Sequence, residues 1–117
     1  MKILVCGDRD WTDIWTIYDV LNKYPRDTII LHGAARGADT MAGTIAKKLK
    51  FTIHSCPAQW EKYGKAAGPI RNRQMLDMNP DLVIAFHNNI EKSKGTKDCI
   101  KEAEKRGIPV ELISKIK

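Results

Sequence analysis

Short apolar runs alternate with amphipathic stretches along the whole chain, and this alternation is the feature that most constrains the fold. The apolar runs occupy residues 2–6, 28–31, 51–55, 81–86 and 109–113. The amphipathic stretches occupy residues 11–23, 38–50, 67–79 and 96–106. Apolar runs of strand length, separated by helical stretches, are typical of parallel strands joined by helices. Because 117 residues suffice for one hydrophobic core only, we predict a single three-layer α/β domain over residues 1–117, with a parallel sheet of about five strands and helices on both faces.

The positions of the unusual loops select one strand order. Five parallel strands can be ordered 3-2-1-4-5 or 2-1-3-4-5, and ligands bind beyond the carboxyl ends of the strands, where the winding reverses. Loops rich in glycine and charge follow the first, second and fourth apolar runs, at residues 7–11, 32–39 and 87–96. Only the order 3-2-1-4-5 places these three strands side by side. We therefore predict that order, with a crevice between the three loops.

The loop after the second apolar run is the strongest candidate for binding an anion. It consists of His32, Gly33, Ala34, Ala35, Arg36, Gly37, Ala38 and Asp39, and a helical pattern follows directly. A turn of small residues that opens a helix leaves backbone N–H groups free at the helix start, where the helix dipole favours negative charge. We predict a phosphate loop in which Arg36 supplies a cation and Asp39 caps the helix or holds Arg9. An ordinary tight connection between strand and helix is the alternative.

The first loop supplies further candidates, Gly7, Asp8, Arg9 and Trp11. Glycine allows a sharp exit from the strand and a close approach of a ligand to the backbone. Arg9 is expected to point into the same crevice as Arg36, or to pair with a nearby carboxylate. Asp10 or Thr12 is expected to cap the next helix. Trp11 and Trp15 lie four residues apart, a spacing that favours packing in the core.

Two later segments complete the predicted site. In the segment 64–73, Gly68-Pro69 predicts the first turn of a helix, which places Lys65, Arg71 and Asn72 near a helix start. Arg71 and Arg73 are two residues apart and cannot share a helix face, so one of them is expected to serve structure or solvent. Gly95 and Thr96 open another helix aimed at the same edge.

The connection over residues 56–66 is the one long loop of the predicted fold, and it is a candidate lid. It contains Trp60 and Tyr63. Each aromatic side chain either stacks on a nucleobase or packs the lid onto the domain.

Composition excludes several other classes of protein. The 20 Lys and Arg against 14 Asp and Glu give a formal charge of +6, which favours anionic partners. Three cysteines, far apart, predict neither disulfides nor a thiolate metal site, and three scattered histidines predict no metal. We expect no cofactor, no membrane span and no signal peptide, and hence a cytoplasmic location.

Taken together, the motifs resemble the DUF2493 or YspA-type family of the SLOG superfamily, whose wider membership includes LOG-type nucleotide phosphoribohydrolases and the DprA DNA-processing proteins. The matching pieces are residues 7–13, 32–39, 60–72, 80–86, 95–96 and 107–110. The resemblance implies a Rossmann-like α/β fold, strand-end loops that bind nucleotides or nucleotide-derived ligands, and a homo-oligomer. Two departures are Asp8, where the family often has Ser, and Ala34, where it often has Gly. Asp8 is therefore expected to contact ribose hydroxyls rather than phosphate.

A third departure concerns a catalytic residue of the wider superfamily. LOG-type hydrolases carry a catalytic Glu three residues after the Thr of their Gly-Gly-x-Gly-Thr segment, and the corresponding residue here is Cys99. The leading hypothesis is therefore a protein that senses or sequesters a nucleotide-derived small molecule, such as an ADP-ribose-like or cyclic-nucleotide signal. The first alternative is a nucleotide hydrolase or phosphoribohydrolase that uses Asp8, Asp39 or Asp98. The second is DprA-like binding of single-stranded nucleic acid.

Overall fold

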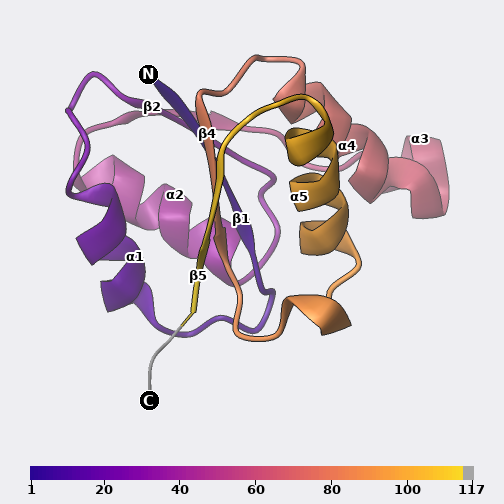
Figure 1. Ribbon diagram of the computed structural model, residues 1–117, viewed down its shortest axis with the longest axis horizontal. Coiled ribbons are helices and arrows are strands. Elements are labelled where there is room, and N and C mark those ends of the chain that lie inside the picture. The colour runs from indigo at the N-terminus through magenta and orange to yellow at the C-terminus, as the bar shows by residue number, and fades with distance from the viewer. Residues whose placement is uncertain (115–117) are drawn as a thin grey trace.

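The computed structural model describes residues 1–114 and contains one parallel sheet of five strands (Figure 1). The strands are β1 (Lys2–Gly7), β2 (Ile29–His32), β3 (Thr52–Ser55), β4 (Leu82–Phe86) and β5 (Val110–Ile113). Their order is β3-β2-β1-β4-β5, and every neighbouring pair is parallel. The predicted strand order is therefore confirmed. Strands β1, β2 and β4, which precede the three unusual loops, lie next to one another.

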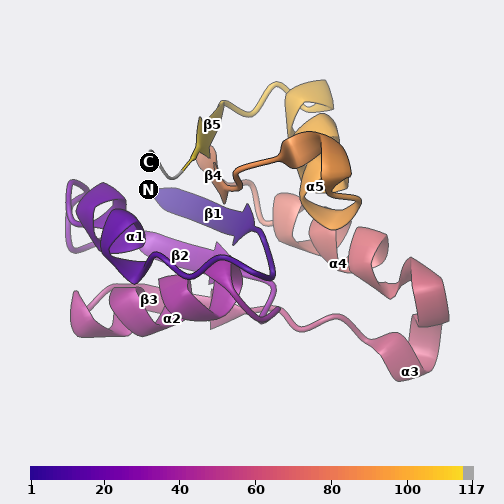
Figure 2. The ribbon, with the colours of Figure 1, turned by 90° about the horizontal axis from the view of Figure 1, so that it is seen from below.

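Helices cover both faces of the sheet, as predicted for a Rossmann-like fold. Helices α1 (Ile14–Leu21) and α2 (Ala38–Lys48) lie on one face, and α4 (Ala67–Leu76) and α5 (Gly95–Lys105) lie on the other (Figures 1 and 2). Each helix returns the chain to the start of the next parallel strand. All three unusual loops consequently open at one edge of the sheet, the carboxyl edge.

Alternate side chains of the central strand supply the two halves of the core. Ile3 and Val5 belong to the apolar cluster under α1 and α2, and Leu4 and Cys6 belong to the cluster under α4 and α5. All four residues are buried. A strand buried on both faces needs such a continuous apolar run, which explains why β1 has no polar alternation.

The start of α1 differs from the prediction. The helix begins at Ile14, and its cap is Asp13, whose carboxylate accepts from the Thr16 backbone N–H at 3.2 Å and from its hydroxyl at 2.6 Å. Trp11 therefore precedes the helix and is buried, while Trp15 is 71% exposed. The prediction that Trp15 packs in the core was wrong, because its spacing from Trp11 has no meaning once the two do not share a helix.

The connection over residues 56–66 is more ordered than predicted. It contains the short helix α3 (Trp60–Tyr63) and a 3-10 turn, η1 (Gly64–Ala66). Figure 2 shows α3 at the far end of the molecule, beyond α4. A second 3-10 turn, η2 (Ile90–Lys92), lies in the loop after β4. Among residues 1–114, no helix is long and apolar enough to cross a membrane.

Candidate functional site

The three unusual loops and α4 enclose a cleft of about 440 Å³ at the carboxyl edge of the sheet, which we call the first cleft. The predicted site residues on its wall are Gly7, Asp8, Arg9, Arg36, Asp39, Arg71, Asn72, Gly95 and Thr96. They come from segments up to about ninety positions apart in the chain. The fold therefore gathers most of the predicted site in one place.

A second cleft, also of about 440 Å³, adjoins the first. Its wall includes Gly33, Ala34 and Trp60, together with Pro57 and Ala58 from the segment before α3. Both clefts are lined by Arg9, Ala35, Arg36 and Arg71. The two clefts thus meet along a boundary that carries three arginines.

The backbone N–H groups of the second loop are already used within the protein. The carboxylate oxygen Oδ2 of Asp39 accepts from the N–H groups of Gly33 at 3.0 Å and Ala35 at 3.4 Å. Between them, the N–H of Ala34 donates to Nδ1 of His32 at 3.0 Å. An internal carboxylate therefore occupies the position that the sequence suggested for a phosphate. No side chain caps α2 at its start, so the prediction that Asp39 caps this helix was wrong.

Asp39 is buried, and burial raises the pKa of its carboxyl to about 6. The positive charges of Arg71 and Arg9 and the two loop N–H groups lower the pKa, but they do not offset the cost of burial. The pKa of His32, directly before the loop, is lowered by burial and by Arg71. The cleft therefore places a carboxyl that titrates near neutral pH beside cations.

Arg71 links α4 to the second loop. Its Nη1 donates to the carbonyl oxygen of Gly33 at 2.6 Å, and its Nε donates to Oδ1 of Asn72 at 3.0 Å. A Cβ at Gly33 would overlap this guanidinium, so a larger residue there would displace Arg71 from its present position. Although Arg71 is only 9% exposed, it lines both clefts. The two bonds fix the guanidinium at the boundary between them.

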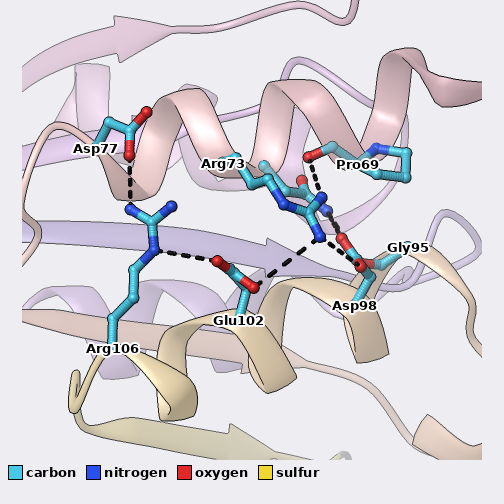
Figure 3. A network of polar contacts seen from close by, with 8 residues as sticks. Pro69, Arg73, Asp77, Gly95, Asp98, Glu102 and Arg106 are labelled. Atoms are coloured by element: carbon cyan, nitrogen blue, oxygen red, sulfur yellow. Dashed lines mark hydrogen bonds and ion pairs between the residues drawn. The ribbon is translucent and has the colours of Figure 1, made fainter.

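Asn72 connects Arg71 to the start of α5. Its amide Nδ2 donates to the carbonyl oxygen of Gly95 and to Oδ2 of Asp98, both at 3.2 Å. Figure 3 shows the adjoining polar network between α4 and α5. Asp98 also lies 4.0 Å from Nη2 of Arg73, and it faces α4 rather than a cleft. The structure thus places this candidate catalytic carboxylate in the contact between two helices.

Arg71 and Arg73 divide their roles as the helical spacing predicts. Nη1 of Arg73 donates to the carbonyl oxygen of Pro69 at 3.1 Å, and Nη2 lies 4.0 Å from Glu102 (Figure 3). Nearer the end of α5, Arg106 donates to Asp77 at 2.7 Å and to Glu102 at 3.3 Å. These half-exposed ion pairs join α4 to α5, whereas Arg71 faces the clefts.

The other loops are shaped by their own hydrogen bonds. The carbonyl oxygen of Asp8 accepts from the N–H of Ala38 at 3.0 Å, which ties the first loop to α2. The carboxylate of Asp8 accepts from the N–H of Asp10 at 2.9 Å. In the third loop, the N–H of Thr96 donates to Oγ of Ser93 at 3.0 Å. Asp8 therefore shapes its turn while its side chain still lines the first cleft.

Besides Asp98, five predicted ligand-binding residues line neither cleft: Trp11, His32, Gly37, Tyr63 and Lys65. Trp11 packs on Phe86 with ring centroids 5.7 Å apart. Gly37 has φ +77°, and a Cβ there would overlap the backbone of the first loop. Its role is therefore to let the first and second loops pack closely together. Tyr63 lies next to Lys62 at the end of α3. Of the two aromatic candidates in the long connection, only Trp60 reaches a cleft.

Several residues of the first cleft were not predicted as site residues: Cys6, Asp10, Met75, His87, Lys92 and Ser93. His87 is buried, and its Nδ1 accepts from the N–H of Asn89 at 2.9 Å. Its position directly after β4 was a usable signal, because ligands bind where strands end. Within residues 1–114, no three His, Cys, Asp or Glu side chains gather so that they could hold a metal ion.

Comparisons with known proteins identify the family. Residues 1–63 match the model of the "YspA, cpYpsA-related SLOG family". The "Gene 61 protein" of Mycobacterium phage D29 is 36% identical over an alignment of 118 positions that covers 93% of each chain. Among solved structures, DNA processing protein A (DprA) from Streptococcus pneumoniae superposes with a TM-score of 0.81 at 18% identity. That alignment covers 98% of this chain but 50% of DprA, and it shows a shared fold. Because this family model matches more than half of its residues, the chain belongs to the YspA, cpYpsA-related SLOG family.

Proposed function

We propose that the protein binds a nucleotide-derived small molecule in the two adjoining clefts at the carboxyl edge of the sheet. The observation that carries this proposal is Arg71, a buried guanidinium fixed at the boundary of both clefts. A planar, permanently charged group with little exposure to water is well suited to a phosphate. Arg9 and Arg36 line the same boundary and add positive charge.

The clefts differ in the chemistry that they offer to the rest of a nucleotide. Trp60 supplies an aromatic surface in the second cleft, where a base could stack with a gain of about 1–3 kcal/mol. Asp8 and Asn72 supply polar groups in the first cleft, which suit ribose hydroxyls. A diphosphate at the arginines, with a nucleoside on the side of Trp60 and a second ribose in the first cleft, describes an ADP-ribose-like ligand, and cyclic nucleotides are the smaller alternative.

Calorimetric titration tests this proposal. ADP-ribose, cyclic mononucleotides and nucleoside monophosphates are titrated into the protein and into the Arg36→Ala variant. We expect micromolar or tighter binding of at least one ligand, and loss of that binding in the variant. An absence of heat across the panel, with a folded protein, refutes the proposal.

Hydrolysis of a nucleotide is the second candidate function, and the position of Asp39 favours it. A buried carboxyl with a pKa of about 6 on the wall of a cleft suits a general acid or base. Chromatography of nucleoside monophosphates after incubation with the protein would reveal free base or free phosphate. Turnover that is lost in Asp39→Asn supports hydrolysis. Binding without turnover rejects hydrolysis and supports the binding function.

The structural similarity to DprA suggests single-stranded nucleic acid as a third ligand class. Binding to many phosphates releases counterions, so the affinity for an oligonucleotide would fall steeply with salt. We expect a shallow dependence for the proposed small ligand, because it carries few phosphates. The homo-oligomer and the cytoplasmic location stay predictions, and sedimentation tests the first.

A further inference from the structure

The second loop is held in shape by a carboxylate that shares its surroundings with the proposed phosphate position. Oδ2 of Asp39 accepts from the N–H groups of Gly33 and Ala35, and these bonds close the loop around the carboxylate. Asp39 is 5% exposed and lines the first cleft together with Arg71. A ligand at the boundary of the clefts therefore meets a loop whose form depends on Asp39.

Arg71 has a positive charge that no direct ion pair neutralises among residues 1–114. The acceptors that it contacts are neutral, the carbonyl oxygen of Gly33 and the amide oxygen of Asn72. Its field nevertheless stabilises the charged form of Asp39 and lowers the pKa of that carboxyl. Arg9, on the same wall, acts in the same direction. The charge of Asp39 thus depends on cations that also face the clefts.

An anion bound at these arginines changes that balance. The ligand takes up part of the field of Arg71 and Arg9 and adds a like charge near the carboxylate of Asp39. Both effects disfavour the charged carboxylate. We infer that Asp39 is a positioning residue that takes up a proton when an anionic ligand binds, so that the affinity of this site depends on pH. This inference rests on the proposed function.

The direction of the pH dependence follows from the thermodynamic linkage between proton uptake and ligand binding. Since the carboxyl of Asp39 has a pKa of about 6 in the free protein, it is mostly charged above pH 7. If binding raises its proton affinity about tenfold, the ligand affinity falls about sevenfold as the pH rises from 5.5 to 8, and the bound complex gains a fraction of a proton. Besides Arg9 and Arg71, the titratable groups on the first cleft are Cys6, Asp8, Asp10, Arg36, His87 and the lysines of the third loop.

The experiment uses two anions that hold a constant charge between pH 5.5 and 8. Sulfate probes the cations alone, and ADP-ribose probes the proposed ligand site; phosphate monoesters are avoided because they ionise near pH 6 themselves. Carboxyl carbon resonances report the titration midpoint of Asp39 with and without each anion. Calorimetry in buffers of different ionisation enthalpy counts the protons taken up. We expect a higher midpoint with anion bound and a net proton uptake at pH 7.

Two variants separate Asp39 from its neighbours. Asp39→Asn retains an oxygen that can accept from the loop, and we expect its affinity to lose most of the pH dependence. A contribution from His32, whose pKa is lowered by burial and by Arg71, would survive in this variant. Asp10→Asn removes an exposed carboxylate on the same cleft, and we expect it to retain the pH dependence.

The outcomes distinguish this inference from the proposed function. If sulfate raises the midpoint of Asp39 while ADP-ribose and the nucleotide panel do not bind, the inference stands and the proposed function fails. If ADP-ribose binds with an affinity that is constant from pH 5.5 to 8, or with an unchanged midpoint of Asp39, the inference fails and the proposed function stands. If neither anion binds, both fail.

Discussion

Replacement of Arg71 by methionine tests both its structural and its binding role. Methionine fills much of the same space but removes the hydrogen bonds to Gly33 at 2.6 Å and to Asn72 at 3.0 Å. Each bond from a charged donor contributes about 1.5–3 kcal/mol, and two buried acceptors lose their partner. The apolar chain of methionine offsets part of this loss, so we expect the free energy of unfolding to fall by about 2–4 kcal/mol.

Thermal and chemical denaturation measure this change. For a chain of 117 residues, 1 kcal/mol corresponds to about 4 °C in Tm, so Arg71→Met is expected to melt about 8–16 °C lower. Its affinity for ADP-ribose should fall about thirtyfold, the equivalent of about 2 kcal/mol.

Arg36→Met is the matched control, since Arg36 lines the same two clefts. Its side chain is 75% exposed, and its ion pair with Asp10 spans 3.4 Å at the surface. Such pairs contribute at most about 1 kcal/mol, so the variant should melt within about 4 °C of the parent while its affinity still falls. If Arg71→Met melts and binds like the parent protein, the assignment of Arg71 as clamp and anion anchor is refuted.

Three further predictions concern single residues. Gly37→Ala should lower the free energy of unfolding by about 1–3 kcal/mol in urea titrations, because φ is +77° and the added methyl group meets the first loop. Gly64→Ala, at φ +56° in open space, should lower it by about 1 kcal/mol. Equal effects would contradict the role of Gly37 in packing against the first loop. Trp60→Ala should leave Tm nearly unchanged, since the residue is 51% exposed. The variant should bind a nucleobase ligand more weakly by about 1–3 kcal/mol in calorimetry. A loss of stability with unchanged binding would instead assign Trp60 to packing. Because the pKa of Asp39 is raised from 3.8 to about 6, ionisation of this carboxyl opposes folding. Its contribution to the free energy of unfolding is therefore most favourable below about pH 4 and falls by about 3 kcal/mol in all as the pH rises through 6. The stability of Asp39→Asn relative to the parent should rise from pH 5 to 8, and a constant difference would contradict this prediction.

The strand order could be predicted from the sequence because it depends on repeated, local patterns. Five apolar runs fix the strands, and the positions of the loops then leave one order in which those loops meet. The same reasoning placed Arg71 and Arg73 on different faces of α4, since helical geometry alone decides that.

The interior of the site could not be predicted in the same way. The N–H groups of Gly33 and Ala35 were expected to be free for a ligand, but Asp39 uses both of them. Arg71 reaches Gly33 from 38 positions away, and no local pattern encodes such a contact. Likewise, Asp98 could be judged only after α4 and α5 were seen to pack together, with Asn72 and Arg73 on its carboxylate.

The central claim is that a nucleotide-derived ligand occupies the two clefts on either side of Arg71. The most direct test is a titration of the ¹⁵N-labelled protein with ADP-ribose, followed by NMR. We expect shifts concentrated at the backbone amides of Gly33, Ala35 and Gly95, and at the indole N–H of Trp60. The claim is contradicted if these resonances stay unchanged at millimolar ligand, or if the shifts gather on α1 and the opposite edge of the sheet.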